Sequence, residues 1–140
     1  GAGAGFPGLV IAILAAEHGG TTHTLIESDN RKAAFLRQVV REVGVVVDIL
    51  CTRIEIPETR AKVGEVNCVT ARALAPLPRL VDWAYPYYGS TTVGLFSKGR
   101  EVAAEIEDAA RIFAFDYELK PSVTDPEGRV LLLKSLNRRA

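Results

Sequence analysis

Hydrophobic residues recur along the first third of the chain with the spacing of helices and strands in alternation. The apolar residues within 9–14 repeat at helical spacing until a Gly-Gly pair, which predicts a helix directly after the glycine-rich opening. Residues 22–27 alternate and then end in a carboxylate, which predicts a strand that finishes at Glu27. A second helix is expected from Asp29, as N-cap, to Gly44, a residue typical of a helix end.

The middle of the chain continues this alternation. The second helix has an apolar stripe made of Phe35, Leu36, Val39, Val40 and Val43. Residues 45–51 are almost continuously apolar and β-branched, as expected for a strand buried on both faces of a parallel sheet. Pro76 and Pro78 mark the start of another helix. The remaining elements expected here are helices over 77–85 and 101–113, the latter with Phe113 on its apolar side, and strands over 66–70 and 91–96.

The last part of the chain departs from the alternation of helices and strands. Residues 115–123 and 129–136 are two strand-like runs, and the Thr-Asp-Pro-Glu-Gly turn between them leaves no room for a helix. Two strands joined in this way must be antiparallel. The pattern therefore predicts a single α/β domain over residues 1–140, with a mostly parallel sheet that ends in an antiparallel hairpin.

The chain opens inside a glycine-rich loop with no strand before it. Such a loop is normally delivered by a strand, so we expect the first strand of the domain to lie upstream of Gly1 and the domain to be truncated at its N-terminus. Loss of a central strand would expose neighbouring strand edges, and we therefore expect the isolated 140 residues to be poorly stable or inactive.

Composition and charge indicate an ordinary globular domain. The chain has 48% hydrophobic and 24% charged residues, with 17 basic and 17 acidic side chains. Cys51 and Cys68 lie in apolar runs without metal-site spacing, which predicts buried free thiols, no metal and a reducing, cytoplasmic compartment. No apolar stretch approaches the roughly 20 residues that cross a bilayer, so no membrane anchor is expected. We expect a monomer.

The glycine-rich opening is the strongest sign of chemistry. Gly1, Gly3, Gly5 and Gly8 directly precede a helix, whose free N–H groups and dipole favour a negatively charged or carboxylate-bearing ligand. Glu27 follows about twenty residues later at a strand end, where a carboxylate can accept hydrogen bonds from both hydroxyls of a ribose. The pattern predicts a nucleotide site; a tight turn beside a solvated glutamate is the structural alternative.

The loop alone leaves the cofactor open. Its Gly-x-Gly-x-x-Gly pattern also satisfies the dinucleotide fingerprint, so a fragment of an NAD-dependent oxidoreductase is one alternative. A non-catalytic nucleotide-binding or RNA-binding module is another. The terminal hairpin is similar to the last two strands of class I S-adenosylmethionine-dependent methyltransferases, which favours that class by fold analogy.

Five segments together resemble one family more specifically. They are residues 1–8 (GAGAGFPG), 25–37 (LIESDNRKAAFLR), 52–55 (TRIE), 69–77 (VTARALAPL) and 95–99 (LFSKG). In order and spacing this set resembles the RsmG family, also called glucose-inhibited division protein B. The resemblance implies a class I methyltransferase, with a Rossmann-like fold, that uses S-adenosylmethionine to methylate N7 of a guanine in 16S ribosomal RNA. The RNA, free or within the small ribosomal subunit, would be its partner.

The resemblance also implies roles for individual residues. Gly1 and Phe6 would contact the cofactor from the loop, with Glu27 at its ribose, and we expect Gly3 of the same loop to belong to this cofactor site. Ile54 and Glu55 would lie beside the adenine. The arginine of a Ser-Arg-Ala segment matches Arg72, which is also expected to belong to the cofactor site. Ile54 stands where alanine is usual, and Ala71 stands where serine is usual.

Methyl transfer to guanine N7 suits the side chains that are present. N7 carries a free lone pair in the neutral base, so no general base is required, and catalysis rests on proximity and electrostatics. A cation can hold the guanine through O6, on the base edge that Arg and Lys read in nucleic acids. Arg72 and Lys98, each near a strand end, are the catalytic candidates.

Overall fold

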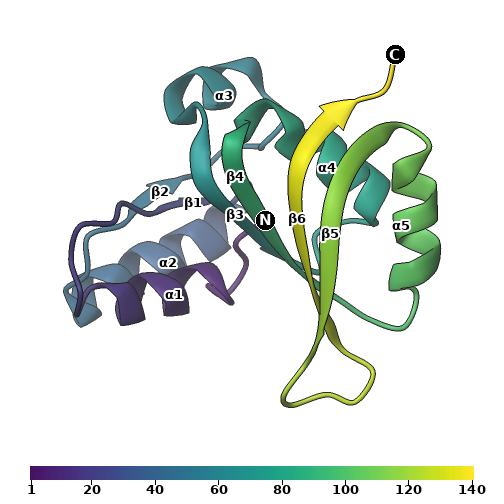
Figure 1. The fold of residues 1–140 in the computed structure, drawn as a ribbon. Coiled ribbons are helices and arrows are strands. Elements are labelled where there is room, and N and C mark those ends of the chain that lie inside the picture. The colour runs from purple at the N-terminus through teal and green to yellow at the C-terminus, as the bar shows by residue number, and fades with distance from the viewer. The chain divides into compact units, whose positions relative to one another are not determined.

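The computed structural model describes all 140 residues, which form two compact units, residues 1–62 and 63–140. Figure 1 shows the course of the chain and labels its helices and strands.

The first unit holds a two-stranded parallel sheet and its helices. Its elements are α1 (Gly8–Ala15), β1 (Thr24–Ile26), α2 (Asn30–Val43), β2 (Asp48–Leu50) and α3 (Pro57–Val63), the last of which ends at the unit boundary. Strands β1 and β2 pair in parallel from Thr24 opposite Asp48 to Ile26 opposite Leu50. Leu9, Leu25 and Leu36 form a small core on the side of the sheet that α1 and α2 cover (Figure 1).

The bounds of α2 follow from its terminal residues, as the sequence predicts. The Asp29 side chain accepts hydrogen bonds from the N–H groups of Arg31 and Lys32, at 2.9 and 3.0 Å, and so caps the first turn. Gly44 ends the helix with φ +77°, a left-handed conformation that glycine adopts without steric cost. The local chemistry of these two residues therefore sets both ends of the helix.

Burial in the first unit differs from the sequence prediction. The segment 45–51 was expected to form a strand buried on both faces, but β2 has three residues, none fully buried, and Val46 is 93% exposed. The physical reason is that β2 pairs only with β1 and is packed on one face. The expected apolar stripe of α2 is also narrower, because Phe35 and Val43 are about half exposed.

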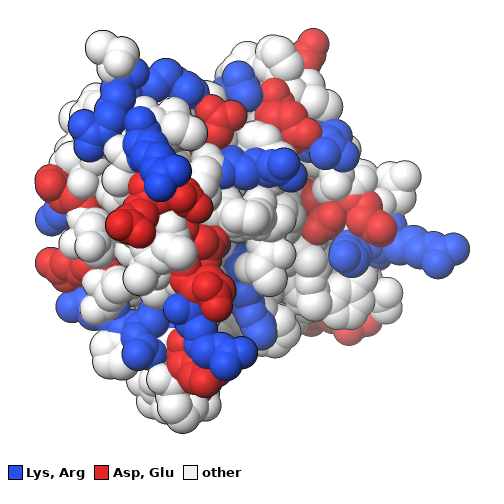
Figure 2. Space-filling view, turned by 90° about the vertical axis from the view of Figure 1, so that its right-hand side faces the viewer, with Lys and Arg blue, Asp and Glu red and all other residues white.

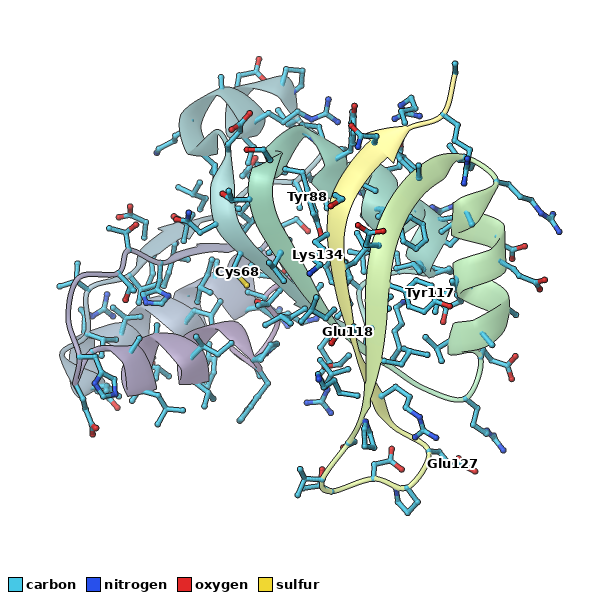
Figure 3. The ribbon with its side chains drawn as sticks, viewed as in Figure 1. Cys68, Tyr88, Tyr117, Glu118, Glu127 and Lys134 are labelled. Carbon is cyan, nitrogen blue, oxygen red and sulfur yellow. The ribbon has the colours of Figure 1, made fainter.

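The second unit is a four-stranded mixed sheet with two covering helices. Its elements are β3 (Val66–Arg72), α4 (Leu77–Ala84), a 3₁₀ turn η1 (Tyr85–Tyr87), β4 (Tyr88–Lys98), α5 (Val102–Ala110), β5 (Phe113–Pro121) and β6 (Arg129–Arg138). The strand order is β3-β4-β6-β5, with β3 and β4 parallel and β6 antiparallel to both of its neighbours. The predicted terminal hairpin is confirmed, and its second strand inserts between β4 and β5. Figure 3 shows Glu127 in the loop that joins the hairpin strands.

The core of the second unit lies between the sheet and the helices α4 and α5. It includes Leu77, Val81, Phe96, Phe113, Leu131 and Leu133, all fully buried. Tyr88 adds a polar contact across the sheet, because its hydroxyl donates to the Leu133 carbonyl at 3.1 Å (Figure 3). Burial raises the pKa of this phenol.

Two sequence expectations are wrong in this part of the fold. The last helix was expected to reach Phe113, but α5 ends at Ala110 and Phe113 opens β5, opposite Arg138. Its ring is buried against Tyr85, with ring centroids 5.7 Å apart. Phe113 therefore has the spacing of a helical core residue, but it packs into the core from a strand. Both cysteines are free as expected, but Cys51 is half-buried and Cys68 is exposed on β3, which has a paired strand on one side only. No helix of the structure is both long enough and apolar enough to span a membrane.

Candidate functional site

The glycine-rich loop is bound directly to Glu27. One carboxylate oxygen of Glu27 accepts a hydrogen bond from the N–H of Gly3 at 2.7 Å, and the other accepts from the N–H of Asp29 at 2.9 Å. The Ala2 N–H donates to the Ile26 carbonyl at 3.0 Å, which aligns the start of the chain with the end of β1. The structure therefore brings together the loop and the acid that the sequence paired.

The carboxyl group of Glu27 is held in its ionised form. Glu27 is only 5% exposed, and its burial acts to raise the pKa of the carboxyl group. The hydrogen bonds from Asp29 and Gly3, together with the positive charge of Lys32, outweigh this effect, so the pKa is lowered. A carboxylate has about four acceptor positions, and the two N–H groups use two of them. Glu27 can therefore still accept hydrogen bonds from ligand hydroxyls.

The glycines of the loop serve two different purposes. Gly5 has φ +96°, and a Cβ there would stand 2.7 Å from the Cβ of Leu9, so this glycine permits close packing. Gly3 has φ +56°, and a Cβ there would meet nothing within 4 Å. Open space beside Gly3 leaves the backbone accessible to a ligand. Phe6 belongs to the same loop and is 59% exposed.

The turn after β2 carries the second predicted acid. The Nε of Arg53 donates to Glu55 Oε1 at 2.6 Å, and this hydrogen bond is the main cause of a lowered pKa for Glu55. Ile54 lies in the same turn.

The two catalytic candidates belong to the second unit, at the carboxyl ends of paired strands. Arg72 is the last residue of β3 and pairs with Ser97 of β4. Lys98, the last residue of β4, comes directly after Ser97. The Arg72 side chain is exposed and makes no hydrogen bond or ion pair. Lys98 differs: its side chain is only 8% exposed, and its Nζ lies 2.9 Å from Glu105 Oε1 and 3.0 Å from the Ala75 carbonyl oxygen.

Glu105 is a residue that sequence reasoning missed. Besides pairing with Lys98, its Oε1 accepts a hydrogen bond from the N–H of Leu77, at 2.8 Å. A signal was available in the sequence, because a helix start at Pro76-Leu77-Pro78 lacks a side chain that can cap it locally. The acceptor therefore had to come from elsewhere in the fold. No group of three or more His, Cys, Asp or Glu residues is arranged to hold a metal ion.

Comparisons of sequence match nearly the whole chain to one family of proteins. The model of the family described as rRNA small subunit methyltransferase G matches residues 1–139. A protein of Parvibaculum lavamentivorans named ribosomal RNA small subunit methyltransferase G is 47% identical over 98% of this chain and 60% of its own length. A protein of the same name from Methylorubrum populi is 43% identical over 99% of this chain and 64% of its own length. The chain thus spans about three-fifths of these relatives.

Several solved structures of other proteins have a fold similar to that of this chain. A fibrillarin/Nop5p complex matches 96% of this chain and 69% of the solved one with a TM-score of 0.71 at 12% identity. A protein described as a putative rRNA-methylase from Clostridium thermocellum matches 100% of this chain and 84% of its own, with a TM-score of 0.67 at 9% identity. Fibrillarin of Aeropyrum pernix, solved with natively bound S-adenosyl-L-methionine, matches 80% and 55% with a TM-score of 0.57 at 15% identity. The predicted class I methyltransferase fold is confirmed.

Proposed function

The chain belongs to the rRNA small subunit methyltransferase G family, and from this premise we propose that the full-length protein transfers a methyl group from S-adenosylmethionine to N7 of a guanine in 16S ribosomal RNA. The observation that carries the proposal is the hydrogen bond from the Gly3 N–H to the Glu27 carboxylate. It joins an ionised carboxylate to a glycine-rich loop, and the space beside Gly3 in that loop is open. The NAD-dependent alternative receives no support from the two relatives described above, both of which are named as methyltransferases.

The first unit offers the groups that the cofactor requires. Glu27 would accept hydrogen bonds from the two ribose hydroxyls with its free lone pairs. The backbone of Gly1 and Gly3, with the exposed Phe6 ring, would contact the rest of the nucleoside and its amino-acid part. Ile54 and Glu55 would lie beside the adenine, where the Arg53 hydrogen bond keeps Glu55 ionised.

Catalysis requires positioning more than proton transfer. When bound, S-adenosylmethionine supplies an electrophilic methyl group on its sulfonium sulfur. The guanine N7 lone pair needs no deprotonation, so the chain has to hold the base in line and stabilise its charge. Arg72 is the better candidate for holding O6, because its guanidinium is exposed and unpaired, whereas the Lys98 ammonium is already bound to Glu105 and Ala75.

Recognition of RNA by this chain would depend on contacts from individual Lys or Arg side chains more than on the electrostatic field of a continuous basic surface. Acidic and basic side chains are interspersed on the face shown in Figure 2, and the formal net charge is zero. A continuous basic surface is the usual footprint of non-specific nucleic-acid binding. We therefore propose that a monomer acts on 16S ribosomal RNA or the small subunit in the bacterial cytoplasm, with Arg72 as a specific contact.

The experiment combines cofactor binding with methyl transfer by the full-length protein. Calorimetric titration with S-adenosylhomocysteine and, separately, with NADH should give binding of the first alone. Incubation with radiolabelled S-adenosylmethionine and small subunits from a strain that lacks the corresponding methyltransferase should label 16S RNA, and chemical cleavage at N7-methylguanine should locate the label. Binding of NADH alone, or label at another guanine atom, would contradict the proposal.

A further inference from the structure

Three segments of the second unit meet at one carboxylate oxygen. Glu105 Oε1, from α5, accepts hydrogen bonds from the Leu77 N–H at the start of α4 and from Lys98 Nζ at the end of β4. Lys98 Nζ also donates to the carbonyl of Ala75. Both side chains are largely shielded from water, at 8% exposure for Lys98 and 20% for Glu105. The charge-assisted hydrogen bonds of such a shielded pair are shorter and stronger than those of an exposed one.

These contacts hold one backbone N–H group and one backbone carbonyl group of a short segment, residues 73–77, which leads from the end of β3 to the start of α4. Pro76 is the N-cap of α4 and offers no side-chain acceptor, and Pro78 has no N–H. The Leu77 N–H therefore depends on Glu105, and the Ala75 carbonyl on Lys98. An acceptor 28 residues away in sequence and a donor 23 residues away replace local capping.

The segment held in this way begins with an unfavourable backbone conformation. Ala73 has φ +51°, in the left-handed region that residues other than glycine, asparagine and aspartate rarely occupy. Such a conformation persists where the surrounding structure imposes it. Ala73 directly follows Arg72, the exposed and unpaired arginine that ends β3. The direction in which the chain leaves β3, and with it the orientation of Arg72, therefore depends on Lys98 and Glu105, whose charged groups are largely shielded from water.

We propose that Lys98 and Glu105 are a positioning pair that holds residues 73–77 and thereby orients the Arg72 guanidinium at the carboxyl edge of β3 and β4. Neither side chain touches the substrate; both act through Arg72. This inference rests on the proposed function in so far as Arg72 contacts the guanine. The holding of residues 73–77 itself is independent of that function.

The holding is tested by hydrogen exchange on the full-length protein, without substrate. Glu105→Leu removes the acceptor of the Leu77 N–H, and Lys98→Met removes the donor to Ala75 while it leaves Glu105 bound to Leu77. Both variants should speed exchange in a peptide that covers residues 72–80 by at least tenfold, with the β6 peptide 129–138 unchanged. Equal exchange in peptide 72–80 of the wild type and both variants would overturn the proposal. If Glu105→Leu fails to fold, Lys98→Met decides.

The action through Arg72 is tested by a double-mutant cycle in the methyl-transfer assay. Glu105→Leu alone should lower kcat at least tenfold, with the dissociation constant of S-adenosylhomocysteine within twofold of the wild type. The double variant, Glu105→Leu with Arg72→Ala, should have a kcat less than threefold below that of Arg72→Ala alone. Glu105→Gln retains an oxygen that can accept from Leu77 and should recover part of kcat. If the effects of Glu105→Leu and Arg72→Ala multiply, the pair does not act through Arg72.

An exposed ion pair at the end of the same helix supplies the control. Asp108, on α5, and Arg111, the residue that follows the helix, lie 3.7 Å apart with side chains 58% and 78% exposed, and Asp108→Ala should change neither exchange nor kcat. If the wild type transfers no methyl group to RNA, the proposed function fails, whereas the exchange experiment still decides whether the pair holds residues 73–77. The two failures are thus distinguishable.

Discussion

The carboxylate of Glu27 accepts a hydrogen bond from the backbone N–H of Gly3 at 2.7 Å, across 24 residues of sequence. The same carboxylate accepts from Asp29, the residue that caps α2. Glu27 therefore connects the glycine-rich loop, the end of β1 and the start of α2. A single side chain therefore shapes the loop, and in the function that we propose it also binds the ribose.

Glu27→Ala should weaken binding of S-adenosylhomocysteine by about 1–3 kcal/mol, because it removes charge-assisted hydrogen bonds to the ribose. This corresponds to a roughly 5- to 150-fold rise in the dissociation constant. Calorimetry on the full-length protein measures it. Glu27→Gln keeps one oxygen that can accept from Gly3 or Asp29, and its loss of affinity should be smaller. Unchanged affinity in Glu27→Ala would remove Glu27 from the site.

Glu27 should also make stability depend on pH in the acidic range. Its pKa is lower in the folded protein than the ordinary value of 4.5, so the folded state binds this proton more weakly than the unfolded state does. The stabilisation is fully present above pH 4.5 and is lost as pH falls through the lowered folded value. Urea unfolding at a series of pH values should show a shallower decline in the Glu27→Gln variant than in the wild type.

Glu58 provides the matched control for this pH dependence. It is an exposed carboxylate on α3 that makes no hydrogen bond or ion pair. The decline in the free energy of unfolding of Glu58→Gln should therefore follow that of the wild type. Parallel declines for Glu27→Gln and the wild type would show that the hydrogen bonds from Gly3 and Asp29 do not stabilise the ionised form.

Two glycines of the loop should respond differently to alanine. Gly5→Ala places a Cβ 2.7 Å from the Leu9 Cβ at φ +96°, and overpacking with backbone strain should cost about 2–5 kcal/mol of stability. Gly3→Ala meets nothing within 4 Å, so only the left-handed backbone is penalised, by about 1–2 kcal/mol. Gly3→Ala should instead reduce affinity for S-adenosylhomocysteine. Thermal unfolding and calorimetry of both variants check this, and equal losses of stability would contradict it.

Features set by local chemistry could be predicted from the sequence. Asp29 and Gly44 bound α2 through hydrogen bonds and a left-handed φ that involve neighbouring residues only. The turn before Arg129 forced an antiparallel hairpin because it is too short for a crossover. Burial was predicted less well. Residues 45–51 have strong β propensity, but the number of neighbouring strands and covering helices decides how buried a strand is, and neither is written in the segment itself.

The candidate site divides in another way, between a recurrent sequence pattern and contacts particular to this fold. The pairing of Glu27 with the loop was predictable although 24 residues separate Gly3 from Glu27, because a glycine-rich loop followed about twenty residues later by an acid at a strand end is a recurrent pattern. The contacts of Glu105 were not, because they depend on how α4 packs against α5 and on where β4 ends. For the same reason the sequence indicated Lys98 only as a catalytic candidate and gave no sign that its ammonium is shielded and paired with Glu105.

Arg138 should stabilise the second unit through aromatic contacts more than through its ion pair. Its guanidinium carbon lies 4.8 Å from the Phe113 ring centroid and 5.4 Å from that of Tyr85, and its Nη2 lies 2.7 Å from Asp82 Oδ1. Arg138→Ala should lower the free energy of unfolding by about 1–2 kcal/mol, and Arg138→Lys should restore less than half, because an ammonium cannot stack on the rings. Asp82→Ala should cost under about 1 kcal/mol, since the pair is half exposed. Urea unfolding separates these effects, and a larger loss in Asp82→Ala than in Arg138→Ala would reverse the assignment.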